Sequence, residues 1–258
     1  MTVVLAHAPA VFAQLPNPVL KSVFPPGGQT GKTVDVAVSG SALDGVVRLV
    51  ANHPGISFDR REAGKFRAKI AEDVPPGAYE LRAVGRNGLS SPRTFVVGTR
   101  PEALEVEPDK TTTKPQPIRL NSVVNGRIAK GGDVDRFRFS AKRGQRVVIE
   151  CRAERIDSRL RAVLELYDSR GRRLAVNRGY FGIDPLISFR VPEDGAYIVK
   201  VFDLVFSGSA DHFYRLEIDT GPRVAFAVPP VLQRGQKTKV TLYGWNLRKD
   251  RLSIKQRR

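Results

Sequence analysis

Apolar and polar residues alternate over short runs along most of this chain, and brief continuous apolar stretches interrupt the alternation. Within residues 16–98 these runs occupy 34–38, 46–50, 66–70, 79–84 and 94–97. Turn-forming residues rich in Pro and Gly separate them, at 25–28, 54–55, 75–77 and 87–88. Short strands with this punctuation are typical of a β-sandwich of immunoglobulin-like size, which we predict for residues 16–98.

The pattern resumes over residues 118–220. Its runs are 123–128, 135–140, 146–153, 162–167, 173–177, 186–190, 196–202 and 213–218. Tight turns are expected at 168–171 and 193–195. Strands with alternating faces at this density predict a second sandwich of two sheets. Since no segment carries a long apolar stripe of 3.6-residue period, helices should be minor.

Residues 99–117 have a different composition. Acidic positions give way to a run of Lys, Thr and Pro with few apolar residues, and Pro115 and Pro117 stand two apart. Such a segment is expected to be an extended linker. It marks the clearest domain boundary in the chain.

An internal repeat joins the two ends of the chain. Residues 229–247 align with residues 25–43 without a gap and share both prolines, a Gln, two glycines, a Val and the final Leu. Residues 221–258 therefore predict a second copy of the first module that stops after two or three strands, which cannot bury a face alone. Either the chain is a fragment of a longer gene product, which we favour, or this tail pairs with a neighbouring domain. The predicted fold class is all-β, with tandem sandwiches.

The first residues indicate the compartment. Residues 1–14 hold a short apolar run with small residues before Gln14, as in a signal peptide, but no Lys or Arg precedes the run. We favour an incomplete signal peptide over an unstructured terminus, and so expect a secreted or periplasmic protein. No apolar stretch approaches the ~18–20 residues that a membrane-spanning helix needs.

The charge balance favours acidic partners. The chain has 43 Lys and Arg against 26 Asp and Glu, a net charge of +17. However, the basic residues are dispersed along strands, as where Arg136 and Arg138 alternate with Phe137 and Phe139. The compact exception is the tail, with Arg248, Lys249, Arg251, Lys255, Arg257 and Arg258. We expect loose attraction to anionic surfaces and no specific nucleic-acid site.

Candidate catalytic groups are few. Cys151 is the only cysteine, which excludes an intrachain disulfide, and its apolar strand-like setting predicts an inert buried thiol. A serine triad can be imagined from His212 after Asp211 with Ser207 or Ser209, but no Gly-x-Ser-x-Gly elbow supports it. The other histidines are His7, in the signal segment, and His53, beside a turn. We assign no catalytic, cofactor-binding or metal-binding residue and predict that the chain is not an enzyme.

The middle domain resembles the bacterial pre-peptidase C-terminal domain family. The resemblance rests on ordered motifs within residues 132–139, 164–174, 192–201 and 213–218. It implies a jelly-roll-like β-sandwich that accompanies secreted peptidases and large exported proteins, and that lacks catalysis of its own. The flanking segments resemble, more loosely, the immunoglobulin-like (IPT/TIG-like) modules of cell-surface and sugar-associated proteins.

The resemblance opens the possibility of calcium, which some relatives such as collagen-binding modules use. Asp133 and Asp135 stand two apart at a strand start, so both can point to one side. Calcium takes six to eight oxygen ligands, so further carboxylates would have to gather there. The candidates are Asp157, Asp168, Asp184, Asp194 and Asp211. The alternative, which we favour, is that these aspartates accept hydrogen bonds from turn amides.

A binding face is the last candidate. Residues 177–185 form a loop with Tyr180 and Phe181 beside Arg178. Aromatic and Arg side chains at a loop tip are common in contact surfaces, although rings that fold inward to plug the sandwich are the favoured alternative.

Together these features predict an exported, non-catalytic modular protein that adheres to extracellular or cell-envelope polymers or proteins. The alternative is the accessory portion of a secreted peptidase whose catalytic domain is not on this chain.

Overall fold

The protein is described by a computed structural model that covers residues 16–107 and 114–247. The predicted signal segment and the basic tail from Arg248 onward lie outside the described residues. As predicted, the fold is all-β: strands dominate, and the one helical element described is a short 3-10 turn, η1 (Glu154–Ile156). No helix of the described residues is long and apolar enough to cross a membrane.

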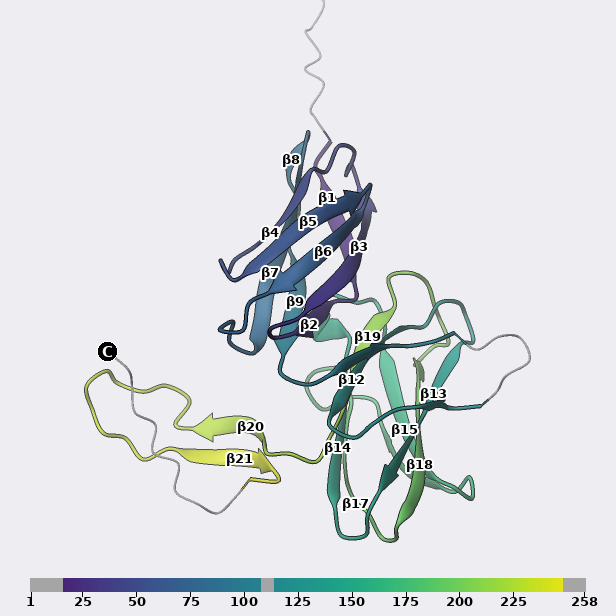
Figure 1. Ribbon diagram of the computed structural model, residues 1–258. Coiled ribbons are helices and arrows are strands. Elements are labelled where there is room, and N and C mark those ends of the chain that lie inside the picture. The colour runs from purple at the N-terminus through teal and green to yellow at the C-terminus, as the bar shows by residue number, and fades with distance from the viewer. Residues whose placement is uncertain (1–15, 108–113, 248–258) are drawn as a thin grey trace, which may run out of the picture.

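Two stacked sheets form the first module (Figure 1). One sheet has the order β1-β3-β6-β5 and the other β2-β9-β7-β4, with β8 paired to β7. The strands are β1 (Val19–Phe24), β2 (Gly27–Gln29), β3 (Thr33–Ser41), β4 (Arg48–Ala51), β5 (Ile56–Glu62), β6 (Lys65–Ile70), β7 (Gly77–Gly85), β8 (Gly88–Leu89) and β9 (Arg93–Gly98). Leu20, Phe66, Leu81 and Phe95 are buried between the sheets.

Strand β2 begins where the sequence suggests a turn. Gly27 and Gly28 pair in parallel with Val96 and Val97 of β9. A Cβ on Gly27 would lie 2.1 Å from the carbonyl oxygen of Val96, so only glycine lets the two backbones approach this closely.

Two five-stranded sheets form the second module, with orders β10-β12-β19-β14-β17 and β11-β13-β18-β15-β16. The strands are β10 (Glu102–Leu104), β11 (Gln116–Pro117), β12 (Ser122–Arg127), β13 (Val134–Ala141), β14 (Arg146–Arg152), β15 (Ala162–Asp168), β16 (Arg173–Asn177), β17 (Leu186–Arg190), β18 (Gly195–Asp203) and β19 (Phe213–Asp219). Alternate residues such as Phe137, Phe139, Val199 and Leu216 point inward and fill one core.

The segment between the modules is extended, and both of its described ends pair with the second sandwich. β10 lies parallel to β12, and β11 lies parallel to β13. Each sheet of the second module therefore gains an edge strand from the connecting segment. Residues 108–113, between these strands, are outside the described part of the chain.

The last described strands, β20 (Arg223–Val228) and β21 (Thr241–Trp245), form a separate antiparallel pair. Its register reproduces that of β1 and β3 at a constant offset, with Val19 opposite Ser41 and Arg223 opposite Trp245. The irregularity in register falls at the equivalent place in both pairs. The repeat seen in the sequence is thus matched by the backbone.

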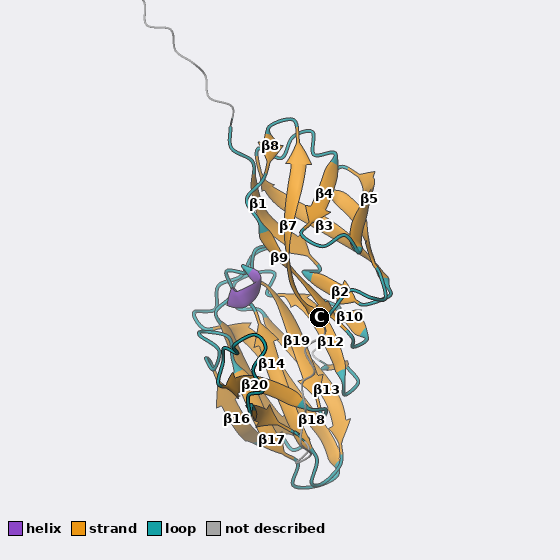
Figure 2. Ribbon diagram, turned by 90° about the vertical axis from the view of Figure 1, so that its left-hand side faces the viewer, coloured by secondary structure: helices purple, strands orange, loops and turns teal. Residues whose placement is uncertain are grey.

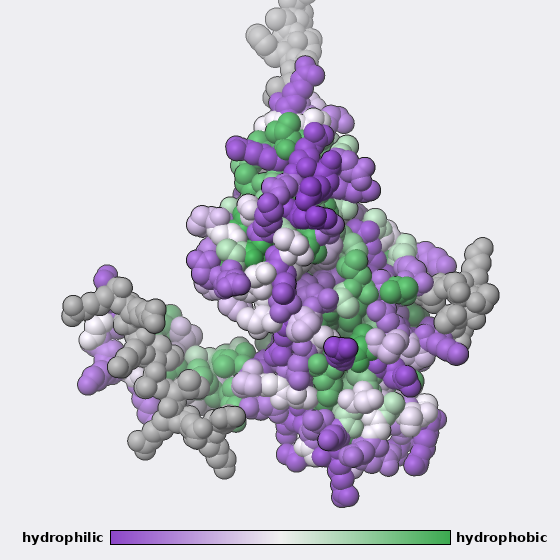
Figure 3. Space-filling view, viewed as in Figure 1, coloured by the Kyte–Doolittle hydropathy of each residue, from purple (hydrophilic) through white to green (hydrophobic). Residues whose placement is uncertain are grey.

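The two strand pairs differ in what covers them. Leu20 of β1 is 0% exposed, whereas its equivalent in β20, Val224, is 51% exposed. Phe226 and Tyr243 stack on each other with centroids 4.7 Å apart and are also exposed. Figure 3 shows this apolar surface as green on the arm that projects beside the second module. The face of β1–β3 that is buried in the first module corresponds to a face of β20–β21 that is largely exposed to solvent.

The first module stands on one end of the second, and the β20–β21 arm leaves from the side (Figures 1 and 2). η1 lies at the junction against β9 (Figure 2). There Val96 of the first module packs with Ile156 and Phe213 of the second. The guanidinium of Arg127 lies 3.8 Å above the Phe24 ring.

Candidate functional site

His212 and Ser209 lie together, but as part of a turn. The Ser209 hydroxyl is 2.7 Å from Nδ1 of His212 and also accepts a hydrogen bond from the backbone of Asp211. The amide of His212 in turn donates to the carbonyl of Ser209. A serine nucleophile needs a free hydroxyl, an oriented base and an oxyanion hole. Since this hydroxyl is engaged within its own turn, we read the pair as structural.

The remaining sequence candidates for catalysis have equally local roles. Cys151 is fully buried, and burial raises the pKa of its thiol well above the usual value, so the reactive thiolate is disfavoured. His53 accepts a hydrogen bond from the amide of Gly55 and meets Tyr79 edge to face. His7 lies outside the described residues.

The aspartates considered as calcium ligands mostly accept hydrogen bonds from backbone amides. Asp133 accepts from Ala129 and Val134. Asp168 accepts from two amides of its turn, and Asp194 accepts from Arg143. Asp157 crosses between modules to accept from the amide of Thr94. These carboxylates are spread over different ends of the sandwich, and Asp211 contributes only backbone atoms to the contacts described.

Asp135 is the exception, because its side chain points into the core. It is buried and accepts a hydrogen bond of 2.5 Å from the Tyr214 hydroxyl. Burial, together with repulsion from Glu105, raises the pKa of Asp135 to about 8. Burial and repulsion from Glu107 raise the pKa of Glu105 to about 7. The connecting segment thus brings acidic side chains to the end of the sandwich where Asp135 lies.

Among the described residues, this acidic end has no arrangement typical of a metal centre. Within residues 16–107 and 114–247 no group of three or more His, Cys, Asp or Glu side chains is arranged to hold a metal ion. The carboxylate of Asp133 is engaged by two amides and that of Asp135 by Tyr214. The residues present therefore do not fit the calcium that the resemblance raised, and we assign it no role.

The aromatic loop at 177–185 does not plug the sandwich, contrary to the favoured expectation. Tyr180 is exposed and lies against both Phe181 and Trp245, with centroids 4.9 and 5.5 Å apart. The buried carboxylate of Asp184 holds the loop from below, where it accepts from three successive amides and from the Arg155 guanidinium. Tyr180 contacts the β20–β21 arm through Trp245, whereas Phe181 is half-buried, with the Arg155 guanidinium 4.8 Å above its ring.

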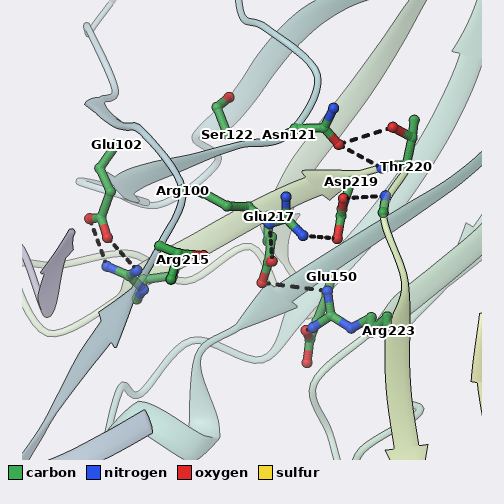
Figure 4. Close-up of polar contacts among 12 residues, drawn as sticks. Arg100, Glu102, Asn121, Ser122, Glu150, Arg215, Glu217, Asp219, Thr220 and Arg223 are labelled. Atoms are coloured by element: carbon green, nitrogen blue, oxygen red, sulfur yellow. Dashed lines mark hydrogen bonds and ion pairs between the residues drawn. The ribbon is translucent and has the colours of Figure 1, made fainter. Parts of the chain in front are cut away.

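A buried polar seam lies beneath the first module (Figure 4). Arg215 of β19 is 4% exposed and makes a bidentate pair with Glu102 of β10, at 2.7 and 2.9 Å. Asn125 of β12 completes the group by accepting from Arg215 and donating to Glu102. A Cβ on Gly27 would lie 2.5 Å from this guanidinium, so the first module rests directly on it.

The seam continues along the outer side of the β10-β12-β19-β14-β17 sheet, to which Glu102, Asn125 and Arg215 belong (Figure 4). Arg100 pairs with Glu217 at 2.9 Å and with Asp219. Arg223, at the base of the arm, pairs with Glu150 and lies 3.4 Å from Glu217. Each of these arginines pairs with a carboxylate of the same surface, so their charges balance one another. This surface joins the connecting segment, the sheet and the arm.

A cavity of about 300 Å³ opens where the modules meet. Its walls include Gly77 and Val97 from the first module and Arg152 and Glu217 from the second. This volume is at the small end of ligand pockets, and its charged groups already bind one another. We regard the cavity as part of the joint between modules.

Sequence reasoning missed the polar seam. Glu102 and Arg215 are 113 positions apart, and no motif in the sequence links them. One signal was present in the sequence: Arg215 stands within a strand whose neighbours Tyr214 and Leu216 are apolar.

Comparison with known proteins places the second module in a family. Residues 133–203 match the model of the bacterial pre-peptidase C-terminal domain, a non-catalytic domain. A probable subtilase-type serine protease of Deinococcus radiodurans is 33% identical over 210 residues. That similarity covers 68% of this chain and 27% of the protease, so the chain spans about a quarter of this relative's length.

Two solved structures match this chain at low sequence identity. The pre-peptidase C-terminal domain of a Bacillus anthracis collagenase is 17% identical and covers 43% of this chain and 99% of its own, with a TM-score of 0.35. SGBP-B of the mixed-linkage glucan utilization locus of Bacteroides ovatus is 11% identical and covers 78% of this chain and 52% of its own, with a TM-score of 0.28.

Proposed function

Because residues 133–203 form a bacterial pre-peptidase C-terminal domain, we propose that this chain is an exported, non-catalytic binding protein. In this proposal it adheres to extracellular or cell-envelope polymers or proteins, in the secreted or periplasmic space. The observation that carries the proposal is the family match. It is supported by the side chains considered for catalysis or metal binding, most of which form local hydrogen bonds within turns. Ser209 and His212 hydrogen-bond to each other within a turn, and Cys151 is fully buried, which supports a binding role over a catalytic one.

The test uses purified protein. We expect retention on insoluble cell-wall or matrix preparations at low salt, with no release of peptides from a denatured protein substrate. Replacing Ser209 by Ala and His212 by Gln should change neither result. Hydrolysis that disappears in those two variants, or a complete lack of retention on every preparation, would contradict the proposal.

A second candidate function is favoured by the similarity to the subtilase-type protease. In that alternative the chain is the accessory portion of a secreted peptidase, and it holds a catalytic domain near its substrate. The gene sequence on either side of this chain distinguishes the two, since only the accessory function requires a peptidase domain in the same reading frame. Fusing a subtilase catalytic domain to the chain should then speed cleavage of insoluble substrate while leaving soluble substrate unaffected.

We also propose the module organisation 16–98, 118–220 and 221–258, with the last as the start of a second immunoglobulin-like module. The matched registers of β1–β3 and β20–β21 support this division. An isolated two-stranded hairpin is marginal in water, whereas a covered one is protected. We therefore expect amide hydrogens of β20–β21 to exchange much faster than those of β1–β3. Equal protection of the two strand pairs in the purified protein would contradict the exposure of β20–β21 described above.

A further inference from the structure

The outer face of the β11-β13-β18-β15-β16 sheet is basic and open to solvent. Inward residues of its strands fill the core, so the alternate residues must point outward. Arg136 and Arg138 of β13 are exposed, and Lys200 of β18 is half-buried beside them. We call these three residues the basic face. None of them forms an ion pair within the described parts of the chain.

The arrangement of charge on this face opposes stability. Arg136 and Lys200 are directly opposite each other across the β13–β18 pair. Like charges at such positions are destabilising. The carboxylate of Glu165 is opposite Lys200 across the β15–β18 pair and offsets part of this repulsion, but it also accepts from the Tyr167 hydroxyl at 2.6 Å and pairs with Arg173 at 2.7 Å. An external acidic group would reduce the remaining repulsion between Arg136 and Lys200.

The aromatic rings on the face are already occupied. The ammonium of Lys200 lies 4.2 Å above the Tyr167 ring. Phe202 stacks on Phe206 with centroids 5.5 Å apart and an angle of 13° between the ring planes. Single-stranded nucleic acids bind such surfaces by stacking bases on free rings. Since these rings have partners, the face favours a ligand that supplies acidic groups and hydroxyls without flat bases.

We infer that the basic face binds an acidic polysaccharide, one that carries carboxylates along an extended chain. The inference rests on the proposed binding function and assigns it a site. Side chains on one face of a sheet recur about every 6.8 Å along a strand and about 4.8 Å between strands. Arg136, Arg138 and Lys200 therefore form a grid of cations that suits repeated carboxylates. Exposed contacts of this kind are individually weak, so affinity depends on several acting together.

The test is electrophoresis of the purified chain through gels that contain polygalacturonate, a polymer of acidic sugars, or neutral dextran. The variant R136Q/R138Q/K200Q removes the basic face. The matched control K21Q/R48Q/R61Q removes three exposed cations of the first module and leaves the same net charge. Circular dichroism verifies that both variants fold. We expect polygalacturonate to retard the wild type and the control, and high salt to abolish the retardation. The basic-face variant should lose about tenfold in affinity.

Three outcomes would overturn the inference. Equal losses in the two triple variants would show that net charge alone drives binding. Unretarded wild-type protein at low salt would remove the acidic polysaccharide as the ligand. Tighter binding of oligodeoxythymidylate that depends on the same three residues would assign the face to nucleic acid. In each case retention on cell-wall or matrix preparations could persist, so the broader binding function is tested separately.

Discussion

Replacing Arg215 by Met should destabilise the protein by about 3–5 kcal/mol, because the change leaves the largely buried carboxylate of Glu102 without a compensating positive charge. The side chains of Arg215 and Glu102 are 4% and 12% exposed, and Asn125, which still donates one hydrogen bond to Glu102, carries no charge to balance it. The first module rests on this guanidinium at Gly27, so its seating should also loosen. Urea unfolding followed by fluorescence and circular dichroism measures the loss.

Two further variants distinguish the cost of burying an unpaired charge from the cost of losing an ion pair. Arg67 pairs with Asp35 at 2.7 Å on the surface of the first module, with both side chains well exposed. R67M should therefore cost less than about 1 kcal/mol. Removing both charges of the Arg215–Glu102 pair, in R215M/E102L, should recover most of the stability, because neither residue then leaves an unpaired charge buried. An R215M variant as stable as R67M would show that the seam is solvated and that our account of it is wrong.

The alternation of apolar positions predicted the second sandwich closely. The expected run 173–177 coincides with β16, and 186–190 coincides with β17. Where alternation is disturbed, prediction failed. β1 carries an irregularity in register between Leu20 and Ser22, which breaks the period of two. β5 is an edge strand with four charged residues in its second half, and its sequence resembles a loop.

The polar groups were harder to place, because their partners are distant in the chain. Nothing local in the sequence indicates that Glu102 of the connecting segment meets Arg215 of β19. Asp135, in contrast, was accessible to reasoning. It shares an inward face with Phe137 and Phe139, so a carboxylate at an apolar position of the pattern was visible in the sequence. Only the structure supplies its partner, Tyr214, and its acidic neighbours.

The buried carboxyl of Asp135 should make the protein lose stability as the pH rises. Its pKa is raised from an ordinary 3.8 to about 8, first by burial and then by repulsion from Glu105. Between these two values the folded state binds more protons than the unfolded state, so the free energy of unfolding falls with increasing pH. The raised pKa of Glu105, about 7, acts in the same direction. We expect a loss of about 2–4 kcal/mol from about pH 5 to about pH 9.

The variant D135N isolates the main source of this slope, because an Asn oxygen can still accept the Tyr214 hydroxyl hydrogen without carrying charge. It should be more stable than the wild type above about pH 8 and should lose most of the slope, with the remainder arising from Glu105. D59N is the control: Asp59 is an exposed carboxyl whose pKa is lowered by its hydrogen bond to Lys69, so its loss should leave the slope unchanged. Urea unfolding in EDTA across this range excludes cations, and repeating it in calcium tests whether a cation can replace the protons. A wild-type profile that is flat, or a slope that survives in D135N, would show that Asp135 ionises freely in the folded state.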